Sequence, residues 1–331
     1  QKWIYKNGWE ELRPAQVEAI KEIRQTSNHL IICSPTASGK TEAAMLPLIS
    51  ELLEKNIYDK SYIVYISPLK ALINDQFTRL DSICVDNDIS VVPWHGDISS
   101  SVKKKVEKNN QAIILITPES LEAMLINTPS KAKFIFKNVI SIVIDEFHSF
   151  LGNDRGNQLI SLLTRLEKFT KNKTRRIGLS ATIGDKDFIA KALDPTDHAK
   201  TKIISGSVSG IQKLKLLIKG YEYDSKLVGE ELEAASKEEI EKIKKKLPDV
   251  LITKDIYRFR NETNLVFPNS IRDVENYVYE GNFLAKEFNE SEVFYPHHSL
   301  LSNDLRRDVE RSAKDGKKPM TIVCTATLEL G

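Results

Sequence analysis

The chain has few cysteines and lacks long apolar runs. Its three cysteines, Cys33, Cys84 and Cys324, lie far apart in 331 residues, which excludes a disulfide framework and a zinc-type spacing. Reduced thiols in a cytosolic core fit this usage better, so we expect a cytoplasmic protein. No apolar run approaches the roughly 18 residues that a membrane span requires, which argues against a membrane protein.

An excess of charge of one sign is also lacking. The formal net charge is only +2, from 48 basic and 46 acidic residues. Charge over the whole chain therefore favours neither the presence nor the absence of a nucleic-acid partner, and any electrostatic footprint must be local. Lys103–Lys105 and Lys171–Arg176 are candidate basic clusters, although ordinary solvated faces explain them equally well.

Length and composition indicate a soluble protein with more than one domain. Hydrophobic residues make up 41% of the chain and charged residues 28%, as in globular proteins. A prior of roughly 150 residues per domain predicts two domains for a chain of this length.

The stretch Leu30–Thr41, LIICSPTASGKT, combines an apolar strand, a turn and the start of a helix. Backbone N–H groups at such a helix start point at one spot, which suits an anion. Gly39 lets the backbone approach a phosphate, Lys40 supplies a positive charge, and the Thr41 hydroxyl can ligate magnesium. The pattern predicts a P-loop.

A helix is expected to precede this strand. Pro14 suits a first helical turn, and Val17, Ile20 and Ile23 follow at helical spacing. Gln16 lies in the first turn, and its amide can pair with the donor and acceptor edge of adenine. Periodicity alone equally allows Gln16 to be an exposed residue on the helix surface.

Strand-like and helix-like stretches alternate over roughly the first 200 residues. This alternation predicts an α/β fold with a doubly wound parallel sheet. The expected strands cover residues 30–33, 61–67, 89–94, 112–116, 139–144 and 176–179.

The fifth of these stretches is nearly uniform in β-branched residues, as a central parallel strand buried on both faces should be. It ends at Asp145-Glu146-Phe147-His148, on the same rim of the expected sheet as the P-loop. Asp145 can hold magnesium through water, and Glu146 can accept the proton of the water that attacks the γ-phosphate. The alternative is a helix N-terminus with favourable acidic residues.

The sixth stretch ends at Ser180-Ala181-Thr182, whose two hydroxyls can bond His148 or the carboxylates. As an isolated tripeptide it would carry no functional meaning.

The remainder of the chain differs in character. Gly229–Leu247 is a highly charged helical run without a wide apolar stripe, which predicts a surface insertion or linker helix. A second α/β unit follows, with strands at 264–267, 293–295 and 321–324 and helices at 270–281 and 300–313. The adjacent His297 and His298 lack other ligands at metal spacing, so a phosphate contact or a satisfied polar contact is the better interpretation.

We therefore expect three parts: residues 1–208 as a first domain, 209–262 as a connecting segment with the charged helical insertion, and 263–331 as a partial second domain. A domain of this last size alone would have an incomplete sheet with an exposed edge, so we expect the natural protein to continue.

Taken in order, the motifs resemble those of superfamily-two DEAD/DEAH-type helicases, and the chain looks most similar to Lhr-like large helicases and their Ski-like relatives. The resemblance spans nearly the whole length. It rests on LRPAQ, SPTASGKTEAAMLP, SPLKALINDQ, WHGD, TPESLEAML, DEFH with a following Arg-Gly pair, GLSATI, LVFPNS, HHSLL and CTATLELG. Small residues other than Gly are ordinary in this family at the position of Ser34, whereas Ala37 departs from the usual glycine.

The resemblance implies two RecA-like domains with ATP and Mg²⁺ between them, the second apparently truncated here. Glu146, Asp145 and Lys40 would serve hydrolysis, with Thr41 and Asp145 on the metal. His148, Ser180 and Thr182 would couple the nucleotide site to motion. The nucleotide would be held by Gln16, Thr36, Ala37, Ser38, Gly39, Lys40, Thr41 and Asp145.

The resemblance also implies a nucleic-acid partner, either single-stranded DNA or RNA or a duplex with a single-stranded tail, and a monomeric protein. The implied contacts are mostly backbone amides and small hydroxyls, which suit a phosphodiester track better than base reading. They fall on Pro68, Lys70, Gly96 and Thr117 in the first domain and on Asn269, His298 and Thr325 in the second.

The sequence thus predicts an ATP-dependent helicase or translocase that moves along a single strand and separates duplexes. Two alternatives stay open. One is a translocase subunit of a restriction or anti-phage system that does not unwind, and the other is a nucleotide-gated clamp on nucleic acid. Intact Lys40, Asp145 and Glu146 argue against the clamp.

The family's last motif, a Gln and Arg set that reaches the γ-phosphate, is not found within these 331 residues. An arginine at the γ-phosphate is worth about a thousandfold or more in rate. We therefore predict that residues 1–331 bind ATP but hydrolyse it slowly. Turnover measured with and without single strands tests this expectation, and vigorous hydrolysis by this chain would contradict it.

Overall fold

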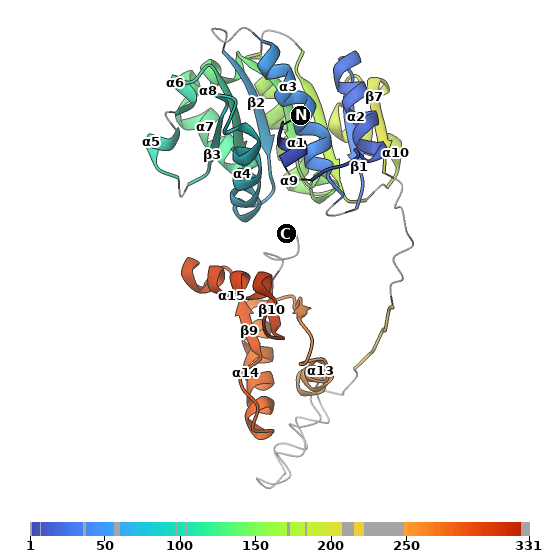
Figure 1. Ribbon diagram of the computed structural model, residues 1–331, viewed down its shortest axis with the longest axis vertical. Coiled ribbons are helices and arrows are strands. Elements are labelled where there is room, and N and C mark those ends of the chain that lie inside the picture. Colours follow the sequence, from blue (N-terminus) through green and yellow to red (C-terminus); the bar gives the residue numbers. More distant parts are fainter. Residues whose placement is uncertain are drawn as a thin grey trace. The chain divides into compact units, whose positions relative to one another are not determined.

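The structure is a computed structural model with two compact units, Gln1–Gln212 and Lys213–Gly331. Each unit has its own parallel sheet (Figure 1). The predicted α/β class with doubly wound parallel sheets is confirmed. The three-part division stays a prediction.

The structure describes residues 2–6, 8–35, 38–55, 60–96, 98–103, 105–170, 173–182, 184–206, 215–221 and 248–325. The charged run 229–247 lies outside these ranges.

The first unit contains a seven-stranded sheet in the order β3-β4-β2-β5-β6-β1-β7, and all its pairs are parallel. The six predicted strands are all present. The seventh, β7, was missed because its sequence, TKIIS, offers only two apolar residues and it pairs at one edge alone. The strands are β1 His29–Cys33, β2 Ser61–Ile66, β3 Ser90–Trp94, β4 Gln111–Ile116, β5 Val139–Ile144, β6 Arg175–Ser180 and β7 Thr201–Ser205.

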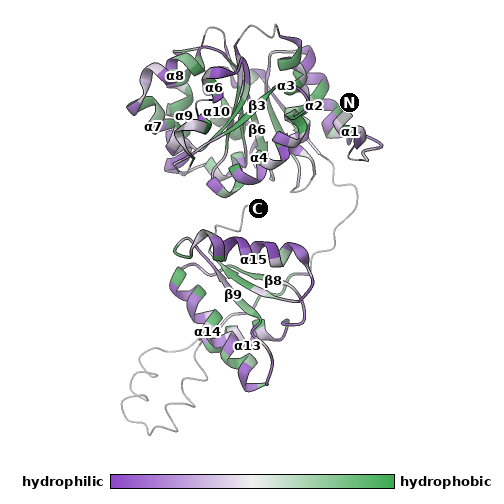
Figure 2. Ribbon diagram, turned by 60° about the vertical axis from the view of Figure 1, so that its left-hand side comes forward, coloured by the Kyte–Doolittle hydropathy of each residue, from purple (hydrophilic) through white to green (hydrophobic). Residues whose placement is uncertain are grey.

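Two layers of helices cover this sheet, and alternating strand residues contribute to each. In β2, Tyr62 and Val64 belong to one apolar cluster, whereas Ile63 and Tyr65 belong to the other. Figure 2 shows the hydrophobic colour concentrated along the strands, between helices that are hydrophilic on their outer sides. One layer holds α2 Pro14–Gln25, α3 Lys40–Glu54 and α4 Lys70–Cys84, and the other holds α6 Lys105–Lys108, α7 Pro118–Asn127, α8 Pro129–Phe136, α9 Asp154–Glu167 and α10 Lys186–Leu193.

Four further short segments complete the described part of the first unit. Two are single-turn 3₁₀ helices, and one of these directly follows the predicted catalytic carboxylates. The segments are α1 Lys2–Lys6, α5 Ser100–Lys103, η1 Phe147–Phe150 and η2 His198–Lys200.

The described part of the second unit is a parallel sheet in the order β8-β10-β9 between two helix layers. Gly281 of α14 lies directly under the ring of Phe294, so the helix approaches the sheet closely there. The helices α13 Pro248–Tyr257 and α14 Ile271–Glu287 pack on one face and α15 Asn303–Asp315 on the other, and the strands are β8 Asn264–Val266, β9 Phe294–His297 and β10 Thr321–Cys324.

The three cysteines are buried and free of disulfide bonds. Among the described residues, no helix has both the length and the apolar character needed to cross a membrane.

Replacing Gly281 by Ala should destabilise the second unit. A Cβ at this position would lie 2.5 Å from the Phe294 ring, and such overpacking costs about 1 to 3 kcal/mol, against a helix-propensity gain of about 1 kcal/mol. Amide hydrogen exchange of β9 and β10 in increasing urea measures the effect. Asn276→Ala on the exposed side of the same helix is the control, and equal protection in both variants would contradict the packing argument.

Candidate active site

The predicted site residues of the first unit gather at the carboxyl edge of its sheet. The P-loop follows β1, Asp145 follows β5, and Ser180 ends β6; these three strands are neighbours in the order β5-β6-β1. Strand pairing continues into the loops, because Ser34 N donates to Ser180 O at 3.1 Å and Asp145 N donates to Ile66 O at 2.8 Å. The loop residues therefore begin from fixed positions.

Gln16 is buried against the P-loop. Its Nε2 donates to the carbonyl oxygen of Gly39 at 3.2 Å, and its Oε1 accepts from Arg13 N at 2.9 Å. Only 3% of Gln16 is exposed, so the interpretation as a surface helix residue is wrong. Gly39 has φ of +84°, which a side chain would strain, and a Cβ there would collide with the Gln16 amide.

Lys40 begins α3 and turns its ammonium back into the loop. Its Nζ donates to Ser34 O at 2.7 Å and more weakly to Pro35 O at 3.4 Å. Burial lowers the pKa of Lys40, while the charges of Glu146 and Asp145 oppose this shift. The cation is therefore held by loop carbonyls and is stabilised by the charges of two nearby carboxylates. The neighbouring loop residues Thr36 and Ala37, also predicted to hold nucleotide, lie outside the described residues.

Asp145 and Glu146 are both withdrawn from water. Burial raises the pKa of Asp145 to about 6, and burial also raises the pKa of Glu146. Glu146 adopts a left-handed conformation with φ of +45°, which costs a non-glycine residue about 1 to 3 kcal/mol. This strained backbone turns the chain from β5 into η1 and places Glu146 Oε2 at 3.4 Å from His148 Nδ1.

Tyr65 is a site residue that sequence reasoning missed. It lies on β2, is fully buried, and faces the Thr41 hydroxyl and the Asp145 carboxylate. Within the described residues, neither its hydroxyl nor that of Ser38 has a hydrogen bond of good geometry. The unsatisfied Ser38 hydroxyl in the phosphate-binding loop fits a phosphate oxygen, and the Thr41 hydroxyl and Asp145 carboxylate beside Tyr65 fit a hard cation. The only available signal was a tyrosine hydroxyl near the end of β2, a strand otherwise made of Ser61, Tyr62 and aliphatic residues.

The three residues predicted to couple the site to motion lie close together. Ala181 N donates to His148 Nδ1 at 3.4 Å, so a backbone amide rather than a hydroxyl makes the bond expected from the SAT tripeptide. The Ser180 hydroxyl donates to the carbonyl oxygen of Thr182 at 2.7 Å and closes the turn after β6. His148 is thus the shared neighbour of Glu146 and this turn.

The four positions predicted to contact nucleic acid in the first unit follow β2, β3 and β4 at the same edge. Thr117 comes directly after β4 and caps α7, because its Oγ1 accepts from Ser120 N at 3.3 Å. Lys70 begins α4, and a Cβ at Gly96 would lie 3.8 Å from its Nζ. Pro68, which completes the set, lies two residues after β2.

The second unit repeats this arrangement with its own strands. Asn269, His298 and Thr325 follow β8, β9 and β10 and lie at the carboxyl edge of that sheet. His298 Nε2 lies 2.6 Å from Glu275 Oε1, and His297 Nε2 lies 3.0 Å from a second carboxylate. Both histidines therefore make polar contacts with carboxylates, as the polar-contact interpretation predicts.

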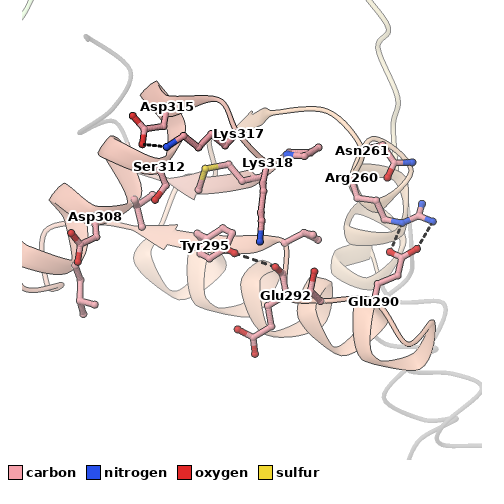
Figure 3. A pocket seen from close by; sticks show the side chains of 16 residues that line it. Arg260, Asn261, Glu290, Glu292, Tyr295, Asp308, Ser312, Asp315, Lys317 and Lys318 are labelled. Carbon is pink, nitrogen blue, oxygen red and sulfur yellow. Dashed lines mark hydrogen bonds and ion pairs between the residues drawn. The ribbon is translucent and has the colours of Figure 1, made fainter.

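A hollow of about 910 Å³ lies at the opposite, amino-terminal end of these strands. Figure 3 shows its walls, where Arg260 pairs with Glu290 and Lys317 pairs with Asp315. None of the predicted site residues lines this hollow, so it is separate from the edge that carries the candidate site.

The sequence of this chain is similar to those of known helicases. The family model described as DEAD/DEAH box helicase matches residues 13–189. The ATP-dependent helicase Lhr-Core protein 2 of Thermococcus barophilus is 32% identical to this chain, over 96% of this chain and 37% of that protein. The chain therefore spans well under half the length of this relative.

Solved structures with related folds also exist. The Mycobacterium smegmatis helicase Lhr bound to ssDNA and AMP-PNP has a TM-score of 0.73 and 26% identity, covering 100% of this chain and 41% of that chain. A DEAD-box helicase bound to ssRNA and UDP-BeF has a TM-score of 0.67 with 19% identity, covering 98% of this chain and 62% of that one. At that identity the likeness concerns the fold alone. The predicted RecA-like fold is confirmed.

Glu146→Gln should abolish ATP hydrolysis and leave ATP binding intact. An amide keeps the size of the side chain but cannot accept the proton of the attacking water, whereas the phosphate-binding loop is untouched. Single-turnover hydrolysis and the affinity for a fluorescent ATP analogue should be measured together. Glu11→Gln, at an exposed position before α2, is the control, and an unchanged hydrolysis rate in Glu146→Gln would remove the assignment of Glu146 as base.

Proposed function

This chain belongs to the DEAD/DEAH box helicase family, and we propose that it uses ATP hydrolysis to move along a single nucleic-acid strand and to separate duplexes. The main support is the arrangement of Lys40, Asp145 and Glu146 around one buried edge of the first sheet. A related helicase has been solved with ssDNA and AMP-PNP, which supports the choice of nucleotide and partner.

In the proposed reaction the P-loop binds the phosphates of ATP. Lys40 would transfer its hydrogen bonds from the carbonyls of Ser34 and Pro35 to phosphate oxygens, which carry more negative charge. Thr41 and Asp145 would hold Mg²⁺, which neutralises charge that develops on the phosphates. Gln16 already donates a hydrogen bond to the Gly39 carbonyl, so adenine bound at Gln16 would be linked directly to the phosphate-binding loop.

Glu146 would act as the general base in this reaction. Its raised pKa, caused first by burial, brings its basicity closer to that needed at neutral pH. His148 lies between Glu146 and the turn at Ala181, so the state of the nucleotide would be transmitted to the end of β6. Ser180 and Thr182 stabilise that turn and complete the proposed coupling set.

The nucleic-acid strand would bind to the residues that follow β2, β3 and β4 in the first unit and β8, β9 and β10 in the second. Gly96, Thr117 and Thr325 offer backbone amides or hydroxyls and Lys70 adds a cation, which suit the sugar–phosphate backbone of DNA or RNA. We further propose that the protein works as a monomer in the cytoplasm, where its three buried thiols would stay reduced.

A duplex with a single-stranded tail tests this function directly. Under single-turnover conditions with excess protein, the chain should displace the labelled strand slowly when ATP is present, in step with its slow hydrolysis, and Lys40→Ala should not, because it loses the phosphate contact. Displacement of a protein block from a single strand without duplex separation would instead support a translocase that does not unwind. Strand affinity that changes with ATP, without either activity, would support a clamp.

A further inference from the structure

Arg155, the second residue of α9, contacts the loop after β2 and the first turn of α7, which follows β4, in the proposed strand site. Its Nε donates to Glu119 Oε1 at 2.7 Å, and its Nη2 donates to the carbonyl oxygen of Pro68. Arginine suits this role because its rigid fork donates in two directions at once. One side chain thereby joins segments that are 36 and 87 residues away in sequence.

The two partners of Arg155 belong to adjacent strands. Pro68 lies two residues after β2, and Glu119 is in the first turn of α7, which begins directly after Thr117 at the end of β4. The strands β2 and β4 pair in parallel, so their loops leave the sheet side by side. The spacing between these loops decides whether their amides and hydroxyls match consecutive phosphates of one strand.

The other side of Arg155 contacts the segment after the carboxylates. Its guanidinium lies 5.5 Å from the centre of the Phe150 ring, at the end of η1. The next residue, Gly156, packs against the Phe150 carbonyl so closely that any Cβ would overlap the oxygen. η1 itself is tied to Glu146, whose carbonyl oxygen accepts from Ser149 N at 2.8 Å.

We propose that Arg155 is a positioning residue that sets the spacing of the loops after β2 and β4 and connects them to the segment that carries Glu146. This inference rests on the proposed function, because the loops matter only if they hold a strand. Arg155 acts through Pro68 and Glu119 and need not touch the nucleic acid. Its loss should weaken strand binding before it alters nucleotide binding.

Arg165 provides a matched control on the same helix. It also pairs α9 with α7, through Glu122 Oε1 and Oε2 at 2.7 and 2.8 Å. Its side chain is 40% exposed, close to the 33% of Arg155. Within the described part of the chain Arg165 bonds to neither loop, so Arg165→Ala removes an inter-helix ion pair without removing the loop contacts.

The experiment compares the affinity for a fluorescent single strand in the whole chain and its variants. Arg155→Ala should bind the strand about tenfold more weakly, since positions that couple sites change affinity by this order. Arg165→Ala should stay within about twofold, as exposed ion pairs contribute little. Affinity for an ATP analogue should be unchanged in both variants.

Two further variants separate positioning from folding. Arg155→Lys keeps the charge but lacks the fork, so it should restore only part of the strand affinity. Glu119→Gln removes one partner, and combining it with Arg155→Ala should cost less than the sum of the two single losses, because both remove the same contact. Equal melting temperatures of the variants would exclude a general loss of structure.

The outcomes distinguish this inference from the function on which it rests. Strand affinity of Arg155→Ala or of Arg155→Lys equal to that of the unaltered chain would overturn the positioning role and leave the proposed function intact. Equal weakening in Arg155→Ala and Arg165→Ala would also overturn it, because helix packing alone would then explain the loss. Failure of the unaltered chain to bind a strand would overturn the proposed function and the inference together.

Discussion

Parallel pairing that extends past the ends of the strands is the constraint on which the site depends. Ser67 N donates to Ile116 O at 3.0 Å, Asp145 N to Ile66 O at 2.8 Å, and Gly206 N to Cys33 O at 2.8 Å. Each loop therefore starts from a hydrogen bond to the neighbouring strand. Irregular backbone can be held rigidly at this edge because its first polar groups are already satisfied.

The carboxylates Asp145 and Glu146, which are held at this edge, are largely shielded from water. The pKa of Asp145 is raised by burial from 3.8 to about 6, so its folded-state value exceeds its unfolded one. The folded chain consequently loses stability as the pH rises from about 3.8 to about 6, and does not regain it at neutral pH. A ligand that compensates these charges binds only the folded state and offsets the cost by mass action. The left-handed conformation of Glu146 adds strain to the same segment.

The sequence predicted the parts of this arrangement that follow from local pattern. Runs such as Val139–Ile144 identified the buried strands, and parallel strands necessarily bring their carboxyl ends to one edge. Contacts between distant segments were not predictable. Tyr65 reads as one more buried aromatic, and the burial of Gln16 requires knowing that α2 packs on α3. β7 carries too little apolar sequence to be recognised, because its pairing with β1 supplies what its composition lacks.

The nucleotide site and the proposed strand site differ in how much formal charge they carry. The nucleotide site concentrates formal charge, whereas Pro68, Gly96 and Thr117 contribute none and Lys70 contributes a single cation. A site with little charge has to gain its affinity from hydrogen bonds whose donors match the repeat of the phosphates, and mismatched donors gain little. The spacing between loops is then the property that controls binding. Arg155 sets that spacing through its contacts with Glu119 and Pro68. Its contact with Phe150 links it through η1 to Glu146, the carboxylate proposed as the base. The charge of Arg155 therefore acts by positioning the loops, and the positioned loops would bind the strand.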